Sequence, residues 1–334
     1  MRVALDVMGG DHAPREILYG ARRALRERPD LFLLLVGPEE VLRKFPSHER
    51  VEKVLTPEWV EMEEAPGEAL RKKPRASIRV ALELVKEGRA QAVVSAGNSG
   101  VTFGAALLTL GRLPGVLRPA IATILPTLRR PAVLVDAGAN VDCKPVHLLQ
   151  FALMGTLFSE RVLGLKRPRV GLLSIGEEGG KGNFLVKRAH ALLAEGPFNF
   201  VGNVEGQHIF FGEAEVIVCD GFVGNICLKV SEGVAEALAQ MLKREVRRDP
   251  LALLGFSLAR RALSRFRRKV DWREYGGAPL LGVNGVVIIG HGRSDARAVK
   301  NALLTAQRFV ETGLVEKLRA CLSRGKPEDR KVVS

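Results

Sequence analysis

Short apolar segments alternate with segments of helical periodicity along nearly the whole chain of 334 residues. The apolar segments read as continuous hydrophobic runs, and helices separate most of them. Such strands are typical of a largely parallel sheet that helices bury on both faces. We therefore predict an α/β fold, with a mostly parallel sheet in the middle of a three-layer α/β/α sandwich. Besides a first strand beginning at Arg2, the predicted strands are 31–36, 92–95, 120–125, 132–135, 170–175, 198–201, 216–219 and 286–289, and the clearest predicted helices are 14–28, 77–86, 146–162 and 226–244.

No Ser- or Pro-rich linker and no repeat of fixed period divides the chain. We therefore predict a single α/β domain over residues 1–334. Residues 241–280 are expected to form a basic amphipathic helical projection, and the polar residues 323–334 a frayed tail. The chain starts directly with a strand, so no signal peptide is expected. No apolar run approaches the roughly 18 residues that a membrane-spanning helix needs.

The first strand leads into the turn D-V-M-G-G-D-H-A-P, residues 6–14. Gly9 and Gly10 permit a tight turn that exposes backbone N–H groups, and Pro14 is suited to open a helix, with Asp11 as a cap. A turn of this kind at a helix N-terminus is a good place to bind an anion. An ordinary strand-to-helix turn explains the same residues, and both interpretations stay open here.

Gly-Asn pairs recur close to the ends of the predicted strands. Loops at the carboxyl ends of parallel strands share one edge of a sheet, where ligands bind. The pairs therefore favour a shared polar cleft, lined by backbone N–H groups and side-chain amides. The alternative is that Gly and Asn simply favour turns. The pairs are 97–98, 182–183, 202–203 and 224–225, and residues 138–140 are a variant in which Asn140 follows Gly-Ala.

Two glycine-rich stretches carry polar side chains. Residues 92–104 lack the spacing of a dinucleotide site, but Ser95, Asn98 and Ser99 are candidates to bind phosphate or to polarise a carbonyl group. Residues 176–183, G-E-E-G-G-K-G-N, do not match a nucleotide-binding P-loop. Lys181 in this loop is a candidate point charge for a small anion, and a solvated surface lysine is the alternative.

An apolar strand at 286–289 leads to a histidine between two glycines, His291. A lone histidine is more often structural than catalytic. This one is followed by Arg293, Ser294 and Asp295, which favours a functional position. An imidazole that titrates near neutral pH can give a proton to a leaving group or take one from a nucleophile.

The four cysteines, residues 143, 219, 227 and 321, have no CxxC spacing. Reduced thiols in a cytoplasmic protein are the simplest interpretation, and we expect no metal site and no cofactor. Cys219 lies in an apolar run and reads as a core residue. A thiol nucleophile would need a partnered base, and the sequence shows no such arrangement.

The chain carries 51 Lys and Arg against 37 Asp and Glu, a net charge of +14. Residues 241–269 hold ten basic and two acidic residues, a net charge of +8. At helical spacing, one arc of this segment is apolar and most arginines lie opposite. Such a segment suits an anionic membrane surface or an acidic carrier protein, and a contact with a sister subunit is the alternative. Nucleic acid is not expected, because no stacking aromatics are interleaved with the charge. The predicted contact residues are Leu251, Leu254, Leu258, Arg260, Arg261 and Arg268.

Several blocks in this order resemble the PlsX family, the acyl-carrier-protein:phosphate acyltransferases of bacterial phospholipid synthesis. They include residues 6–14, S-A-G-N-S-G at 95–100, D-A-G-A-N-V-D-C-K-P at 136–145, 176–183, N-V-E-G at 203–206, C-D-G-F-V-G-N at 219–225, Y-G-G-A-P-L-L-G-V-N-G at 275–285 and G-H-G-R-S-D-A-R-A at 290–298. The resemblance covers nearly the whole chain. Pro74, Arg75 and Ala76 depart from the family's basic loop, which weakens any carry-over to that loop.

The resemblance implies a fold related to phosphotransacetylases and isopropylmalate dehydrogenases, a homodimer, and loose association of a cytoplasmic protein with the membrane. It also implies that acyl-[acyl-carrier protein] and inorganic phosphate give acyl phosphate and free carrier. Phosphate can attack a thioester directly, so neither a metal nor a covalent nucleophile is required. Two other functions stay open: a phosphotransacetylase-like enzyme that uses acyl-CoA, and a non-catalytic membrane adaptor for the carrier protein.

Our hypothesis for the site assigns proton transfer to His291. The Gly9-Gly10 turn, Asn98 and Lys181 serve phosphate and the developing charge, and Asn203 and Asn225 help to shape the cleft. The expected phosphate- or substrate-binding residues come mainly from the glycine-rich turns. They are Gly9, Gly10, Asp11, Ser95, Asn98, Ser99, Asn140, Asn203 and Ser294.

Overall fold

The computed structural model describes residues 1–323 and contains one sheet of eleven strands. The strand order across the sheet is β3-β2-β1-β4-β11-β10-β5-β6-β9-β7-β8. The strands are β1 (Arg2–Asp6), β2 (Phe32–Gly37), β3 (Val51–Leu55), β4 (Ala92–Ser95), β5 (Ala120–Leu125), β6 (Ala132–Val135), β7 (Arg169–Ser174), β8 (Asn199–Glu205), β9 (Val216–Val218), β10 (Ala278–Leu281) and β11 (Val286–Ile289).

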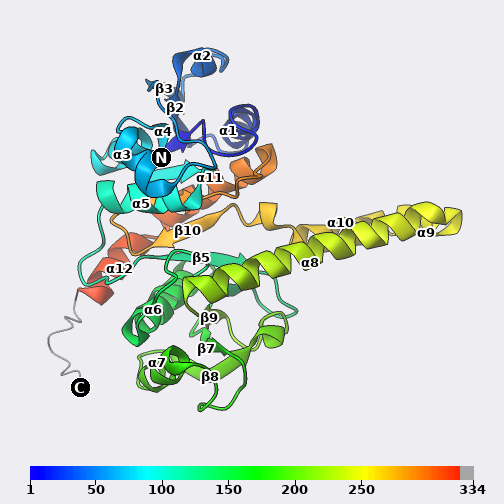
Figure 1. Cartoon of the computed structure of the whole chain (residues 1–334). Coiled ribbons are helices and arrows are strands. Elements are labelled where there is room, and N and C mark those ends of the chain that lie inside the picture. Colours follow the sequence, from blue (N-terminus) through cyan, green and yellow to red (C-terminus); the bar gives the residue numbers. More distant parts are fainter. Residues whose placement is uncertain (324–334) are drawn as a thin grey trace.

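Helices cover both faces of the sheet (Figure 1). They are α1 (Arg15–Glu27), α2 (Glu39–Leu42), α3 (Pro66–Lys72), α4 (Ser77–Lys86), α5 (Ser99–Thr109), α6 (Pro145–Arg161), α7 (Phe184–Ala194), α8 (Gly221–Arg248), α9 (Pro250–Leu258), α10 (Arg260–Val270), α11 (Ala296–Glu311) and α12 (Leu314–Leu322). Helices α1, α6, α7, α11 and α12 share one core cluster with the sheet. Helices α3, α4 and α5 share a second cluster, on the other face. The predicted three-layer α/β/α fold is confirmed.

The spacing of apolar residues explains how each helix binds the sheet. In α1, Ile17, Leu18, Ala21, Ala24 and Leu25 are buried, and they recur at the period of one helical face. Seven predicted strands match β2, β4, β5, β6, β7, β9 and β11 within about a residue. Strands β3 and β10 were not predicted, because β3 alternates with charged residues at the sheet edge and β10 contains a proline.

The sheet consists of two parallel blocks that run in opposite directions. Strands β3, β2, β1, β4 and β11 form the first block, and β6, β9, β7 and β8 form the second. Strands β10 and β5 lie between them, and the pairs β10–β11, β10–β5 and β5–β6 are antiparallel. Our expectation that all the Gly-Asn loops share one edge of a parallel sheet is therefore wrong for loops in different blocks.

Two of the expected loops are part of regular elements instead. Gly202 and Asn203 lie inside β8, which runs on to Glu205 rather than ending at 201. Gly224 and Asn225 lie in the first turns of α8, because the helix begins at Gly221 and not at 226. Asp220 caps α8: its Oδ1 accepts a hydrogen bond from the Val223 N–H at 2.9 Å. This cap fixes where the helix starts.

An arm projects from the body of the molecule. The far half of α8 leaves the body, α9 lies at the tip, and α10 returns beside α8 (Figure 1). None of the residues of α9 is buried. The expected single apolar arc is divided, because α9 ends at Leu258 and α10 starts at Arg260. The helical part of the arm ends at Val270, and residues 278–280 belong to β10 in the sheet.

Among the described residues, no helix is long and apolar enough to cross a membrane. Of the expected frayed tail at 323–334, residues 324–334 lie outside the described part of the chain.

Candidate active site

A buried carboxylate organises the turn after β1. Asp6 is 3% exposed, and it accepts hydrogen bonds from the hydroxyls of Ser77 and Ser95, both at 2.7 Å. The Met8 N–H donates to it at 3.2 Å. Burial raises the pKa of Asp6, and the two hydroxyl groups oppose part of that rise. The carboxylate thus holds β1, β4 and the start of α4 together under the glycine turn.

The turns after β1, β4 and β11 touch one another. A Cβ on Gly9 would lie 2.6 Å from the Gly97 nitrogen, so only glycine fits there. Gly10 has φ +111°, a conformation that favours glycine. The Asp11 N–H donates to the Gly292 carbonyl at 2.8 Å. The predicted residues of the first block therefore come together around His291.

Several of these predicted side chains are already engaged within the protein. The Asn98 Oδ1 caps α5 by accepting from the Gly100 and Val101 N–H groups, and its Nδ2 donates to the Met62 carbonyl at 2.8 Å. The Ser95 hydroxyl is bound to Asp6, and the Ser294 hydroxyl donates to the His291 carbonyl at 2.5 Å. These three side chains shape the turns. Ser99 is exposed at the first turn of α5.

A second buried carboxylate, Asp136, organises the turn after β6. It is 0% exposed and accepts from the N–H groups of Ile121, Gly138, Ala139 and Asn140 at 2.7–3.1 Å. Burial raises its pKa, against the effect of these donors. Asp136 therefore fixes the Gly-Ala-Asn turn.

Asn140 links this turn to its neighbours. Its Nδ2 donates to Asp136 and to the Pro119 carbonyl, both at 2.7 Å, and its own carbonyl accepts from the Gly221 N–H. Its Oδ1 is buried and has no hydrogen-bond partner in the described part of the chain. Asn225 is exposed. It lies beside the same turn, since a Cβ placed on Gly138 would be 3.5 Å from the Asn225 side chain.

Helix α8, which follows β9 of the second block, places polar side chains beside the His291 turn. Asn225, Lys229, Glu232 and Glu236 are three or four residues apart, so they share one face of the helix. The Lys229 Nζ lies 3.1 Å from the His291 Nε2, and the Glu232 Oε2 lies 3.5 Å from it. One turn further on, Glu236 pairs with Arg293 at 3.6 Å. The site thus forms where α8, which starts after β9, passes the end of β11.

The backbone contact of His291 assigns one tautomer of the neutral imidazole. Its Nδ1 accepts from the Arg293 N–H at 3.1 Å, so the proton is assigned to Nε2. Because an ammonium group only donates, Lys229 then donates to Glu232 rather than to Nε2. Nε2 faces Glu232, to which Lys229 also donates at 3.1 Å. The indole of Trp272 lies against the imidazole, with 4.9 Å between ring centroids. Burial raises the pKa of Glu232, but His291 and Lys229 outweigh it and hold that pKa below its usual range.

Lys229 and Glu232 were not among the predicted site residues. Their signal in the sequence is their spacing from Asn225, four and seven residues further along a predicted helix. That spacing marks a shared face only once the helix is known to start at Gly221. Asp6 and Asp136 were also not predicted. Each follows an apolar run, and the sequence does not show how many hydrogen-bond donors surround the carboxylate.

Lys181 and Asn203 belong to the second block of the sheet. Lys181 is exposed in the loop 176–183, and Asn203 fixes that loop by donating to the Glu178 carbonyl at 2.8 Å. In the part of the chain that the structure describes, no hydrogen bond or ion pair joins Lys181 or Asn203 to His291 or to the Gly9 turn. Their role in the same site therefore stays a prediction.

Burial favours the neutral form of three thiols, Cys143, Cys219 and Cys227. Burial raises the pKa of Cys143 to about 12, and the nearby carboxylates Asp136 and Asp220 act in the same direction. Burial also raises the pKa of Cys219 far above its usual value, and that of Cys227. A thiolate is the nucleophilic form of cysteine, so these three positions do not favour nucleophilic catalysis.

Comparisons with known proteins agree on the family and the fold. Residues 1–317 match the family described as "Fatty acid synthesis protein". A protein of Heliobacterium modesticaldum named phosphate acyltransferase is 53% identical, over 94% of this chain and 96% of its own length. One of Moorella thermoacetica with the same name is 52% identical, over 95% of each chain.

Solved structures with low sequence identity share the fold. A phosphotransacetylase from Streptococcus pyogenes has a TM-score of 0.60 at 19% identity, over 92% of this chain and 94% of its own. A 4-hydroxythreonine-4-phosphate dehydrogenase from Klebsiella pneumoniae has a TM-score of 0.52 at 16% identity, over 93% and 99%. The predicted relation to phosphotransacetylases is confirmed at the level of the fold. The dehydrogenase that shares the fold acts on 4-hydroxythreonine-4-phosphate, whereas the resemblance implied isopropylmalate dehydrogenases.

Proposed function

We propose, from the premise that this chain belongs to the phosphate acyltransferase family, that its acyl donor is a long-chain acyl-[acyl-carrier protein] and its product acyl phosphate. The chain is an enzyme, a phosphate acyltransferase of fatty acid and phospholipid synthesis. In the proposed reaction, a phosphate oxygen attacks the thioester carbonyl carbon, and a tetrahedral intermediate forms. The C–S bond then breaks, and the carrier's thiolate leaves and takes up the proton that the attacking hydrogen phosphate releases.

The observation that carries this proposal is the position of His291 between Lys229, Glu232 and the three touching glycine turns. The Lys229 ammonium group is a point charge for a phosphate anion. The Nε2–H of His291 is a donor for the oxyanion or for the departing sulfur. Glu232 is a positioning residue: its carboxylate faces the Nε2–H at 3.5 Å, which is too far for a strong hydrogen bond, so the N–H stays available to the substrate.

The remaining predicted residues keep the roles of our hypothesis. The backbone of Gly9 and Gly10 and the first turn of α5, with Ser99, supply N–H groups for phosphate. Lys181 is assigned to ground-state binding of phosphate from the second block, and Asn225 lies on the α8 face that leads to Lys229. Phosphate attacks the thioester directly. The raised pKa values of Cys143, Cys219 and Cys227 are in line with this, because they disfavour a cysteine nucleophile.

The arm is the proposed contact with an anionic membrane and with the acidic carrier protein. Leu251, Leu254 and Leu258 are 79%, 60% and 82% exposed, so apolar side chains are available at the tip. Arg260, Arg261 and Arg268 add positive charge, each worth about 1 kcal/mol near an anionic surface. A cytoplasmic homodimer that associates peripherally with the membrane is the proposed state of the protein.

An acyl-CoA-dependent phosphotransacetylase is the second candidate, favoured by the fold that the chain shares with the Streptococcus pyogenes phosphotransacetylase. The test supplies long-chain acyl-carrier protein or acyl-CoA, with and without phosphate, and measures acyl phosphate. Faster phosphate-dependent turnover of the carrier thioester supports the proposal, and faster turnover of the CoA thioester supports the second candidate. Thioester that stays intact with both donors contradicts both and leaves the adaptor function.

A further inference from the structure

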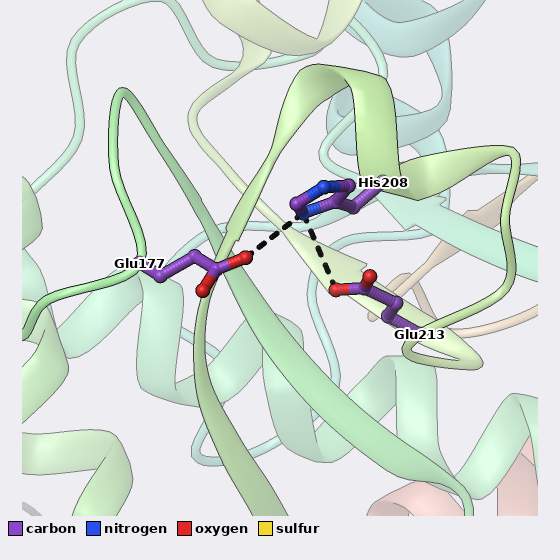
Figure 2. A group of neighbouring side chains, drawn as sticks. All are labelled: Glu177, His208 and Glu213. Carbon is purple, nitrogen blue, oxygen red and sulfur yellow. Dashed lines mark ion pairs between the residues drawn. The ribbon is translucent and has the colours of Figure 1, made fainter.

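One histidine and two glutamates converge beside the second block of the sheet. Figure 2 shows Glu177, from the loop 176–183, pointing toward His208 and Glu213, which both lie between β8 and β9. The His208 Nδ1 lies 3.1 Å from the Glu177 Oε1 and 3.4 Å from the Glu213 Oε2. The three ligand atoms all lie within 4.8 Å of one another. From this geometry we propose that Glu177, His208 and Glu213 bind a zinc ion.

A role as a hydrogen-bond donor does not explain the position of His208 between two carboxylates. The His208 Nδ1 is shielded from solvent and has no hydrogen-bond partner among residues 1–323, although both carboxylates lie within ion-pair distance. A single N–H at this atom can satisfy at most one of the two carboxylates. A divalent cation between the three atoms would use the lone pair of Nδ1 and neutralise both negative charges.

The distances suit a small transition metal. At tetrahedral angles, ligand bonds of about 2.0–2.2 Å place two donor atoms on the same ion about 3.3–3.6 Å apart. The 3.4 Å separation from Glu213 lies in that range, and the 3.1 Å separation from Glu177 lies just below it. Glu177 is 62% exposed at its side chain, so it is free to adjust its distance from Glu213. Imidazole with carboxylates is a ligand set of zinc and similar metals rather than of calcium or magnesium.

Other contacts hold the three ligands in place. Glu177 lies in the loop 176–183, which Asn203 fixes through the Glu178 carbonyl. His208 lies in the short 3-10 helix Gly206–Ile209, and its ring lies against Phe211, with 6.3 Å between centroids. Arg169 binds the Gly212 carbonyl and Glu215, on either side of Glu213. Three protein ligands leave room for water as a fourth.

Zinc bound here ties the loop 176–183 to the segment that precedes β9. Because Lys181 is four residues from Glu177, the bound ion restricts the loop that carries it. The proposal does not depend on the proposed function, and its readouts are binding and loop protection rather than activity.

The test uses untagged full-length protein, stripped with a chelator and titrated with zinc chloride by calorimetry. We expect one zinc per chain with a dissociation constant on the order of 1 µM, and visible absorption when cobalt(II) replaces zinc. Glu177→Gln and His208→Ala should each weaken binding about 100-fold. The matched control is Glu178→Gln, the neighbouring carboxylate in the same loop, which should change binding less than about threefold.

A second measurement is hydrogen exchange of the amides in residues 176–182. Zinc should slow this exchange in the wild type and in Glu178→Gln, but not in His208→Ala. The proposal is overturned if the wild type shows no saturable binding below about 100 µM zinc, weaker than any useful site. It is also overturned if Glu177→Gln and Glu178→Gln behave alike, or if His208→Ala keeps its zinc, because the metal then lies elsewhere in the chain.

Discussion

Replacing Glu232 by glutamine should lower kcat while leaving the fold intact. The change keeps the shape of the side chain but removes the charge that faces the Nε2–H of His291 at 3.5 Å and the Lys229 ammonium group at 3.1 Å. The Glu232 side chain is only 16% exposed, so solvent screens these contacts weakly. Charged hydrogen bonds exceed neutral ones by about 1–2 kcal/mol, which corresponds to about 5- to 30-fold in kcat.

The matched control is Glu236→Gln, one turn further along the same face of α8. Glu236 pairs with Arg293 at 3.6 Å, and both side chains are 54% exposed. Exposed pairs contribute about 0–1 kcal/mol, so this variant should stay within about threefold of wild type. The assay follows phosphate-dependent release of carrier thiol, with circular dichroism and thermal melting as checks of the fold.

The pH dependence gives a further check on Glu232. Its pKa is lowered in the folded protein, so its stabilising effect is present above the unfolded value of about 4.3 and is lost as pH falls through the folded value. The difference in kcat between wild type and Glu232→Gln should therefore persist from pH 6 to 8. If the two glutamine variants show equal kinetics with intact folds, Glu232 does not position His291 and the reasoning fails.

Three further outcomes are expected. Changing all four cysteines to alanine or serine should leave turnover within about tenfold, allowing for lost stability, and an acyl-enzyme trapped on any side chain would contradict direct attack. Lys181→Ala should raise the KM for phosphate more than that for the carrier, whereas His291→Ala should mainly lower kcat; near-wild-type kinetics in both variants would place the site elsewhere. Replacing Leu254 and Leu258 by glutamate should release the protein from anionic vesicles in co-sedimentation yet spare activity on soluble carrier, and unchanged pelleting would show that the membrane contact is not at α9.

The sequence was sufficient to predict the layers of the fold because they depend on local patterns. Continuous apolar runs gave seven strands, and the amphipathic spacing of residues 14–28 gave α1. Strand β10 was not predicted because Pro279 removes a backbone hydrogen-bond donor and weakens the strand pattern in the sequence. Strand direction was also not visible in the pattern, so the reversal between the two blocks was missed.

The sequence was enough to predict those site residues that lie in a single turn. It was not enough to predict contacts between segments that are distant in the sequence. The Gly9 turn and His291 were recognised because glycine pairs at strand ends mark places where backbones approach closely. Their contact with Lys229 depends on the path of α8 across the sheet, which residue spacing alone does not reveal. Lys181 was expected beside the same phosphate because loops after strands were assumed to share an edge, and the opposed blocks remove that reason.

Helix α8 runs without interruption from Gly221, beside the Asp136 turn, to Arg248 at the base of the arm's tip. At 1.5 Å per residue, Lys229 is about 12 Å from the start of this rod and Arg248 about 28 Å beyond Lys229. A rotation of α8 about its first turn would displace Lys229 by about a third as much as Arg248. The proposed docking contact on the arm and the ammonium group beside His291 are therefore joined by one continuous helix.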